Sequence, residues 1–207
     1  MRALYLRMPA VATLVLAVGA GYLIGGIRSA LVVCALTLFI ALSPWWDRAL
    51  VTLYMATFGV VISCLIGFTV GTLCFQNKKS AAFMLGICDI FQTFPSFVYL
   101  IPVMMLFGIT DTSVLIAVVV YATIPATRYT IEGLRSVPVG LHEAATMSGV
   151  NKFQRLTKIE FPLAFPHMML GLNQTIVFAL FMVIIGAFIG TEDLEQYILK
   201  ALSDKNG

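Results

Sequence analysis

The sequence predicts an all-helical transmembrane bundle, and three observations indicate this fold class. Of the 207 residues, 60% are hydrophobic and 11% are charged, whereas a soluble globular domain holds about 25% charged residues. The charges lie in short segments between long apolar runs, and several runs reach the roughly 20 residues that a membrane-spanning helix needs. The runs also lack the alternation typical of transmembrane β-barrel strands. We therefore expect an integral membrane protein.

Six apolar segments are expected to form the membrane helices. They cover residues of about 10–27, 30–46, 49–75, 81–108, 113–127 and 163–190. The second and fifth are short for a bilayer core of about 30 Å, so we expect them to tilt or to end among neighbouring helices. A signal peptide is the alternative for the first segment, but its length and the lack of a clear cleavage site favour a retained helix.

The loops between these segments predict the orientation of the bundle, because cytoplasmic loops are rich in Lys and Arg. Lys78 and Lys79 lie between the third and fourth segments, and residues 128–158 hold five more basic side chains. The loop between the fourth and fifth segments holds Asp111 and no basic residue. We expect both basic loops to face the cytoplasm. This places the N-terminus, despite its two arginines, and the tail from Thr191 on the outside.

The segment from residue 128 to 162 is too polar to span a membrane, and its pattern predicts a helix–turn–helix. Pro138 can open the first helix, since a proline in the first turn loses no hydrogen bond. Gly149 can supply the left-handed residue that ends it. Asn151 and Gln154 match a capping box, which starts the second helix. That helix is expected to end near 159, before the chain returns into the membrane at 162.

Small residues gather at one end of this helix–turn–helix, at Ala144, Ala145, Ser148 and Gly149. Because small side chains allow a close approach, the element can dock in a groove of a partner protein. An amphipathic loop helix resting on lipid headgroups is the alternative. The pattern of residue types alone leaves both open.

The spacing in this segment resembles the EAA loop of bacterial ABC importer permeases. The matching positions are Glu143, Ala144, Ala145, Gly149, Ile159 and Pro162. The family pattern is E-A-A, three residues, G, nine residues and I-x-x-P, and Ser148 departs from the Asp that many members carry before the Gly. The resemblance implies that the element is a coupling helix, which docks on a nucleotide-binding subunit and transmits its ATP-driven closure to the membrane helices.

A second stretch narrows the resemblance to glycine betaine, proline and choline permeases. Residues 89–108 resemble the fourth-helix region of that subfamily, and residues 46–53 and 171–175 are also similar. The resemblance covers roughly residues 46–203 and departs at 191–196, where the subfamily is usually Gly-rich. Members have another transmembrane helix after this point. We therefore expect this chain to be a fragment or a truncated member that lacks the last helix of the type I importer permease fold.

The resemblance also implies a domain organisation and a set of partners. Residues 1–46 would form N-terminal transmembrane helices, and residues 47–207 a permease domain with a cytoplasmic coupling loop at about 128–162. The expected partners are a pair of ABC ATPase subunits, a second permease copy in a homodimer, a periplasmic or extracellular substrate-binding protein, and membrane lipid. The expected location is the bacterial inner membrane, which the chain crosses several times.

No cofactor is expected in this chain. It lacks the G-x-x-x-x-G-K-[ST] phosphate loop, so ATP and Mg²⁺ would bind the ATPase subunits, which would catalyse hydrolysis. His142 and His167 have no acidic or cysteine neighbours at ligand spacing, and the four cysteines form no CxxC pair. We expect no metal site, no disulfide framework and small buried cysteines. The net charge of +3 is scattered, which argues against a nucleic-acid partner.

Polar and kinked positions are the candidates for a translocation path. The candidates are Asp89, Gln92, Thr93, Phe94, Pro95, Phe97, Tyr99, Asn173 and Gln174. A charge within an apolar segment is usually functional or paired, and Asp89 could instead pair with Lys79 or Arg128. Pro95 and Pro102 are expected to interrupt the helix, and Gln92 and Thr93 could satisfy the freed backbone groups. Broken helices line the cavities of many transporters, although packing without substrate contact is equally compatible.

An aromatic cluster accompanies the kink, formed by Phe91, Phe94, Phe97 and Tyr99. Aromatic faces bind quaternary ammonium groups, but packing or lipid contact is the commoner role of such residues. Asn173 and Gln174 either face the path or bond between helices. The expected cargo, by resemblance, is a quaternary ammonium osmolyte such as glycine betaine, choline or a proline betaine-like compound.

Other functions have less support. Proline, carnitine or another amino acid is the alternative cargo. An intramembrane enzyme that uses Asp89 would need a second reactive group, and the sequence holds no G-x-S-x-G, HExxH or paired intramembrane aspartates. We therefore expect no catalytic residue. A channel that needs no ATPase is a more distant alternative.

Overall fold

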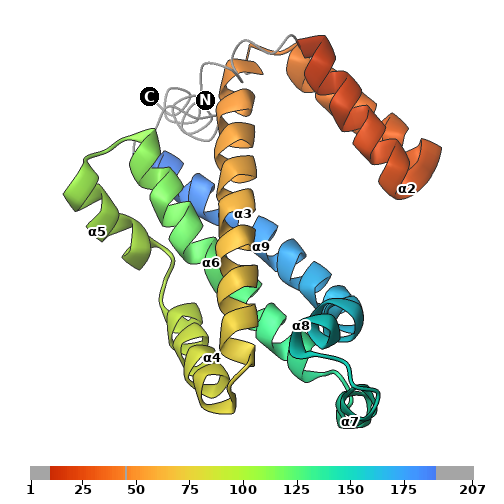
Figure 1. Cartoon of the computed structure of the whole chain (residues 1–207). Coiled ribbons are helices and arrows are strands. Elements are labelled where there is room, and N and C mark those ends of the chain that lie inside the picture. Colours follow the sequence, from red (N-terminus) through yellow and green to blue (C-terminus); the bar gives the residue numbers. More distant parts are fainter. Residues whose placement is uncertain (1–9, 45, 190–207) are drawn as a thin grey trace. The chain divides into compact units, whose positions relative to one another are not determined.

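The computed structural model describes residues 10–44 and 46–189, and these residues form helices and turns without a strand (Figure 1). The chain divides into two compact units, of which the first contains residues up to Met55 and from Ala187 onward. The second unit, Ala56–Gly186, holds the candidate site. The all-helical fold class is confirmed, and the domain boundary predicted at residue 46 stays a prediction.

Within the described ranges, three helical stretches are long and apolar enough to cross a membrane: α3 (Trp46–Phe75), α6 (Asp111–Arg135) and the continuous stretch Lys152–Gly186. A fourth span is possible if α4 (Lys78–Thr93) and α5 (Phe97–Phe107), which are bent by 88° relative to one another, count as one. The count of six predicted membrane helices is therefore too high for this part of the chain.

The excess in the prediction comes from the first unit. There, α2 (Ala10–Ala41) is kinked at Gly25 and Gly26, and the two apolar helices on either side of the kink have 10–17 residues each. Gly26 has a φ of 67°, a left-handed conformation that glycine adopts without steric cost. The break at this glycine pair lies earlier than the boundary expected at 27–30.

In the second unit, a stripe of small residues on α3 packs against α6. Gly59, Ser63, Gly67 and Gly71 recur every four residues, so they share one face of the helix. A Cβ on Gly67 would lie 2.4 Å from Ala126 Cβ, and one on Gly71 would lie 2.7 Å from Thr130 Cβ. Ser63 is fully buried and its hydroxyl donates to the Val119 carbonyl at 3.1 Å. Such small-xxx-small faces let membrane helices approach closely.

Helix α9 (Phe161–Ile189) also packs closely against α6 through glycine residues. A Cβ on Gly171 would lie 2.7 Å from Tyr129 Cβ, and one on Gly186 would lie 2.7 Å from Val114 Cγ1. Likewise, a Cβ on Gly133 of α6 would lie 2.8 Å from the Cβ of His167 on α9. Helix α6 is therefore the central helix of this unit, held closely by α3 and α9.

The predicted interruption of the fourth apolar segment occurs at Pro95. Helix α4 ends at Thr93 and α5 begins at Phe97, whereas Pro102 lies inside α5 and does not break it. The prediction for Pro102 is therefore wrong, because one turn of an existing helix can absorb a proline when neighbouring helices support it. The Tyr99 hydroxyl donates to the Phe91 carbonyl across the bend. The Thr93 hydroxyl donates to the Ile90 carbonyl at 2.7 Å.

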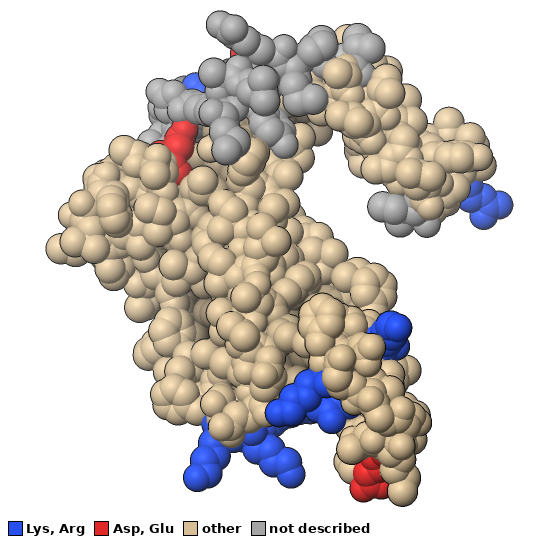
Figure 2. All heavy atoms as spheres, viewed as in Figure 1, with Lys and Arg blue, Asp and Glu red and all other residues tan. Residues whose placement is uncertain are grey.

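The basic segments of the second unit lie together. Figure 1 shows the α3–α4 turn and the α7–α8 region at the same end of this unit, with the α5–α6 turn at the other end. Lys and Arg side chains gather at the first of these ends (Figure 2). The two basic loops thus face the same side, as predicted. That this side is the cytoplasm stays a prediction.

Candidate functional site

The candidate site is a helical hairpin formed by α7 (Val139–Met147) and α8 (Lys152–Arg155). Pro138 is the N-cap of α7, and Gly149 has a φ of 71° in the turn after it. The Asn151 side chain accepts from the Gln154 backbone N–H at 2.8 Å, and the Gln154 side chain accepts from the Asn151 N–H at 3.2 Å. The predicted helix starts, the glycine turn and the capping box are confirmed.

The second helix of the hairpin does not end near Ile159. It passes through one π turn, η1 (Leu156–Glu160), and continues directly into α9. The Phe161 N–H donates to the Leu156 carbonyl, five residues earlier. A widened turn leaves room for the ring of Pro162, which would clash with the preceding turn of a regular α-helix. The predicted helix end near Ile159 is therefore wrong, and α8, η1 and α9 form one continuous helix. That the chain returns into the membrane at Pro162 stays a prediction.

The hairpin presents an uncovered apolar surface. Met147 is 90% exposed and Phe153 is 73% exposed, while Glu143 and Ala144 are also exposed. Ala145 is buried. Large exposed apolar side chains that cluster at one place are typical of interaction sites. The remaining motif residues are placed differently, since Gly149 and Pro162 are exposed and Ile159 is half-buried.

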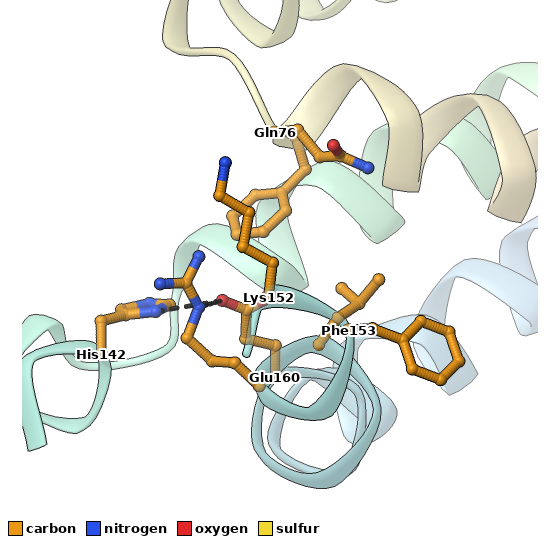
Figure 3. A pocket seen from close by; sticks show the side chains of 8 residues that line it. Gln76, His142, Lys152, Phe153 and Glu160 are labelled. Carbon is orange, nitrogen blue, oxygen red and sulfur yellow. Dashed lines mark hydrogen bonds and ion pairs between the residues drawn. The ribbon is translucent and has the colours of Figure 1, made fainter. Parts of the chain in front are cut away.

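A buried carboxylate lies beneath the hairpin. Glu160, the last residue of η1, is only 2% exposed. One of its oxygens, Oε1, accepts from Arg155 Nε at 3.0 Å and lies 3.0 Å from His142 Nδ1. Figure 3 shows His142 of α7 and Glu160 pointing toward one another. Sequence reasoning considered His142 only as a metal ligand and did not consider Glu160.

This carboxylate borders a cavity of about 390 Å³. The cavity lies between the end of α3, α7 and the α8–η1 segment. Its lining residues are Phe75, Gln76, His142, Lys152, Phe153, Arg155, Leu156 and Glu160.

A second group of polar residues lies on α4 and α6. Arg128 forms an ion pair with Asp89 through Nη1 and another with Glu132, at 2.9 Å, through Nε. Arg128 Nη1 also donates to Gln92 Oε1 at 3.1 Å. Of the alternatives for Asp89, the structure shows the pair with Arg128. An Arg between two carboxylates is a strong, charge-assisted arrangement, and it ties α4 to α6.

These residues border an open groove of about 550 Å³. The lining residues are Gln92, Pro125, Arg128, Tyr129, Glu132, Gln174 and Phe178. The groove therefore brings together two of the predicted path residues, Gln92 and Gln174. Asp89 does not line it but forms an ion pair with Arg128, which does. Asn173 is exposed and does not line it, and neither do Thr93 and Pro95.

The aromatic cluster differs from the predicted one. Phe91 and Tyr99 have ring centroids 5.8 Å apart, Tyr99 and Tyr121 5.2 Å, and Tyr121 and Phe178 4.7 Å. These four rings form a row from α4 across α5 and α6 to the groove on α9. Phe94 and Phe97 are about half exposed. No local pattern indicates Tyr121 and Phe178, because their ring contacts depend on how the helices pack.

The cysteines are free thiols. Cys64 and Cys88 are buried as predicted, whereas Cys34 and Cys74 are only partly buried. Across residues 10–44 and 46–189, no group of three or more His, Cys, Asp or Glu side chains could hold a metal ion.

Comparison with known proteins places these features in context. The family described as binding-protein-dependent transport system inner membrane component matches residues 59–206. The chain is 88% identical over 207 residues to the trimethylamine N-oxide transport system permease protein TmoV of Pelagibacter ubique, and covers 29% of it. It is 45% identical over 203 residues, or 98% of its length, to the TmoV protein of Ruegeria pomeroyi, and covers 31% of that protein.

A more distant relative and a solved structure extend the comparison. The glycine betaine/proline betaine permease protein ProW of Escherichia coli is 32% identical over 96% of this chain and 56% of that protein. An inward-facing structure of the MetNI methionine ABC transporter matches with a TM-score of 0.62 and 23% identity, over 70% of this chain and 74% of that one. This structural likeness supports the fold. The chain spans less than a third of the length of the TmoV relatives.

Proposed function

Because this chain belongs to the family of binding-protein-dependent transport system inner membrane components, we propose that it is the membrane-embedded permease part of an ATP-driven importer. It works with a pair of ATPase subunits, a second permease copy and an external substrate-binding protein in the bacterial inner membrane. ATP and Mg²⁺ bind the ATPase subunits. The observation that carries the proposal is the exposed apolar hairpin of α7 and α8, which holds the E-A-A and Gly positions of the coupling motif.

The hairpin supports a mechanism of alternating access. A partner that moves α8, the second helix of the hairpin, can move α9, because α8, η1 and α9 form one continuous helix. Closure of the ATPase pair on ATP favours one state of the membrane helices, and hydrolysis releases it. A partner shifts such an equilibrium only if it binds the two states with different affinity. The ATPase must therefore bind the hairpin with a different affinity in each of the two states.

For the cargo, we propose a small compound with a fully N-methylated nitrogen and a negative oxygen. The relatives named above are described as trimethylamine N-oxide and glycine betaine/proline betaine permeases, and both classes of compound share this chemistry. Tyr129 and Phe178 offer aromatic faces to the methylated cation, an interaction of about 0.5–2 kcal/mol per ring. Arg128 offers donors to the oxygen. Trimethylamine N-oxide ranks first, glycine betaine second, and choline, proline and carnitine follow.

The test is uptake by the full-length protein, reconstituted in vesicles with its ATPase and binding protein. We expect ATP-dependent uptake of labelled trimethylamine N-oxide, with less uptake of glycine betaine and least of choline. Glu143→Lys should abolish uptake and co-purification of the ATPase while leaving membrane insertion intact. Lys158→Ala, an exposed change on the adjacent η1 segment, is the matched control. Normal uptake by Glu143→Lys, or uptake without ATP, would refute the proposal.

A further inference from the structure

We propose that Glu160 is the positioning residue through which displacement of α7 reaches the membrane helix α9. The inference rests on the proposed coupling function and identifies a contact outside the E-A-A motif. Its basis is the 3.0 Å contact between Nδ1 of His142, the residue directly before Glu143, and the buried carboxylate of Glu160, the last residue before α9.

The covalent path from α7 to α9 runs through a turn. The chain turns between Met147 and Lys152, and the turn includes Gly149 with its left-handed backbone. Two backbone hydrogen bonds hold this turn to the end of α7, from the Gly149 N–H to the Thr146 carbonyl and from the Val150 N–H to the Ala145 carbonyl, each at 3.1 Å. The His142–Glu160 contact bypasses this turn, because it joins α7 to η1 directly.

Burial makes the contact stiff. Glu160 is 2% exposed, and a buried carboxylate keeps its position only when paired and hydrogen-bonded. His142 Nδ1 and Arg155 Nε both contact Oε1 of Glu160. A displacement of His142 therefore also displaces the oxygen that Arg155 binds. Arg155 belongs to α8, which is continuous with α9. The contacts among these three side chains therefore connect α7, α8 and η1.

The π turn has a defined role in this arrangement. It adds one residue to the helical turn at Leu156–Glu160, which changes the direction of the side chains that follow. The structure places Glu160 at the end of this turn, facing inward toward α7 (Figure 3). A displacement of α7 then acts on the beginning of a helix that packs against α6 from Ala164 to Gly186.

The test compares ATP hydrolysis with uptake in the reconstituted full-length transporter. His142→Ala and Glu160→Met, which keeps a side chain of similar length without an oxygen, should each lower the number of substrate molecules imported per ATP hydrolysed at least tenfold, while ATPase binding and hydrolysis continue. The double variant should be no worse than the worse single one, since both remove the same contact. Lys158→Ala should match the wild type. A wild type that binds no ATPase would instead overturn the proposed function itself.

Reconnection distinguishes a transmission contact from one needed only for folding. His142→Cys and Glu160→Cys are combined in a full-length background from which all native cysteines have been removed. The two thiols are then bridged with a short bis-methanethiosulfonate, which forms a disulfide with each thiol and releases methanesulfinate, since a direct disulfide requires Cα atoms about 4.4–6.8 Å apart. We expect the bridged protein to regain uptake per ATP and to lose it again when the bridge is reduced. Wild-type coupling in the unbridged double variant, or no recovery on bridging, would overturn the inference.

Discussion

The close approach of α3 to α6 gives the most quantitative prediction of stability. Replacing Gly67 with Ala would place a Cβ 2.4 Å from Ala126 Cβ and 2.9 Å from the Thr127 backbone N. Carbon atoms pack at about 3.5–4.0 Å, so the helices must separate by roughly 1 Å. Because the neighbours are backbone and Cβ atoms, no rotamer change can relieve the clash. Overpacking of this kind costs about 1–3 kcal/mol.

The assay is thermal denaturation of the full-length protein in detergent, followed by the loss of its monodisperse peak in size-exclusion chromatography. A change of 1 kcal/mol shifts the Tm of a domain of 150–250 residues by about 2–4 °C, so Gly67→Ala should lower the Tm by roughly 2–12 °C. Gly86→Ala on α4 is the matched control, since a Cβ there meets nothing within 4 Å. That control should keep or slightly raise the Tm, because Ala favours a helix by up to about 1 kcal/mol. Equal Tm values for the two variants would refute the close packing of α3 on α6.

Three further predictions concern the site. Gly149→Ala should cost the hairpin turn about 1–2 kcal/mol, because its φ of 71° is left-handed, and should lower uptake without changing membrane insertion. Gly86→Ala on α4, where a Cβ meets nothing within 4 Å, should behave as the wild type in the same uptake assay. Arg128→Gln should lower the initial rate of uptake by leaving Asp89 unpaired, and adding Asp89→Asn should recover part of it; no recovery would argue against a coupled pair. Tyr99→Phe should lower the Tm by the equivalent of about 1–3 kcal/mol, since a carbonyl at the bend loses its donor; an unchanged Tm would show that this bond contributes nothing.

Local signals in the sequence predicted the hairpin well. Pro138, Gly149 and the pair Asn151 and Gln154 each act within four residues of the chain, so their backbone effects do not depend on distant packing. The break at Pro95 follows from the same kind of reasoning.

Features that depend on contacts between distant residues were missed. His142 and Glu160 meet only because α7 folds back onto η1, and the row of rings through Tyr121 and Phe178 requires three helices to pack together. The small-residue stripe on α3 had a visible signal, the spacing of four from Gly59 to Gly71. The break at Gly25 and Gly26 was expected a few residues later, at 27–30.

The central claim is that a partner ATPase contacts this hairpin, and site-specific photocrosslinking in cell membranes tests it most directly. A photoreactive residue replaces Met147 on α7, which is 90% exposed, or Met105 on α5, which is 83% exposed. Helices α7 and α5 lie apart in the second unit, with α7 at the end that holds the α3–α4 turn and α5 leading to the α5–α6 turn at the other end (Figure 1). We predict that Met147 captures the ATPase subunit and that Met105 does not. Capture from neither position, or only from Met105, would contradict the account.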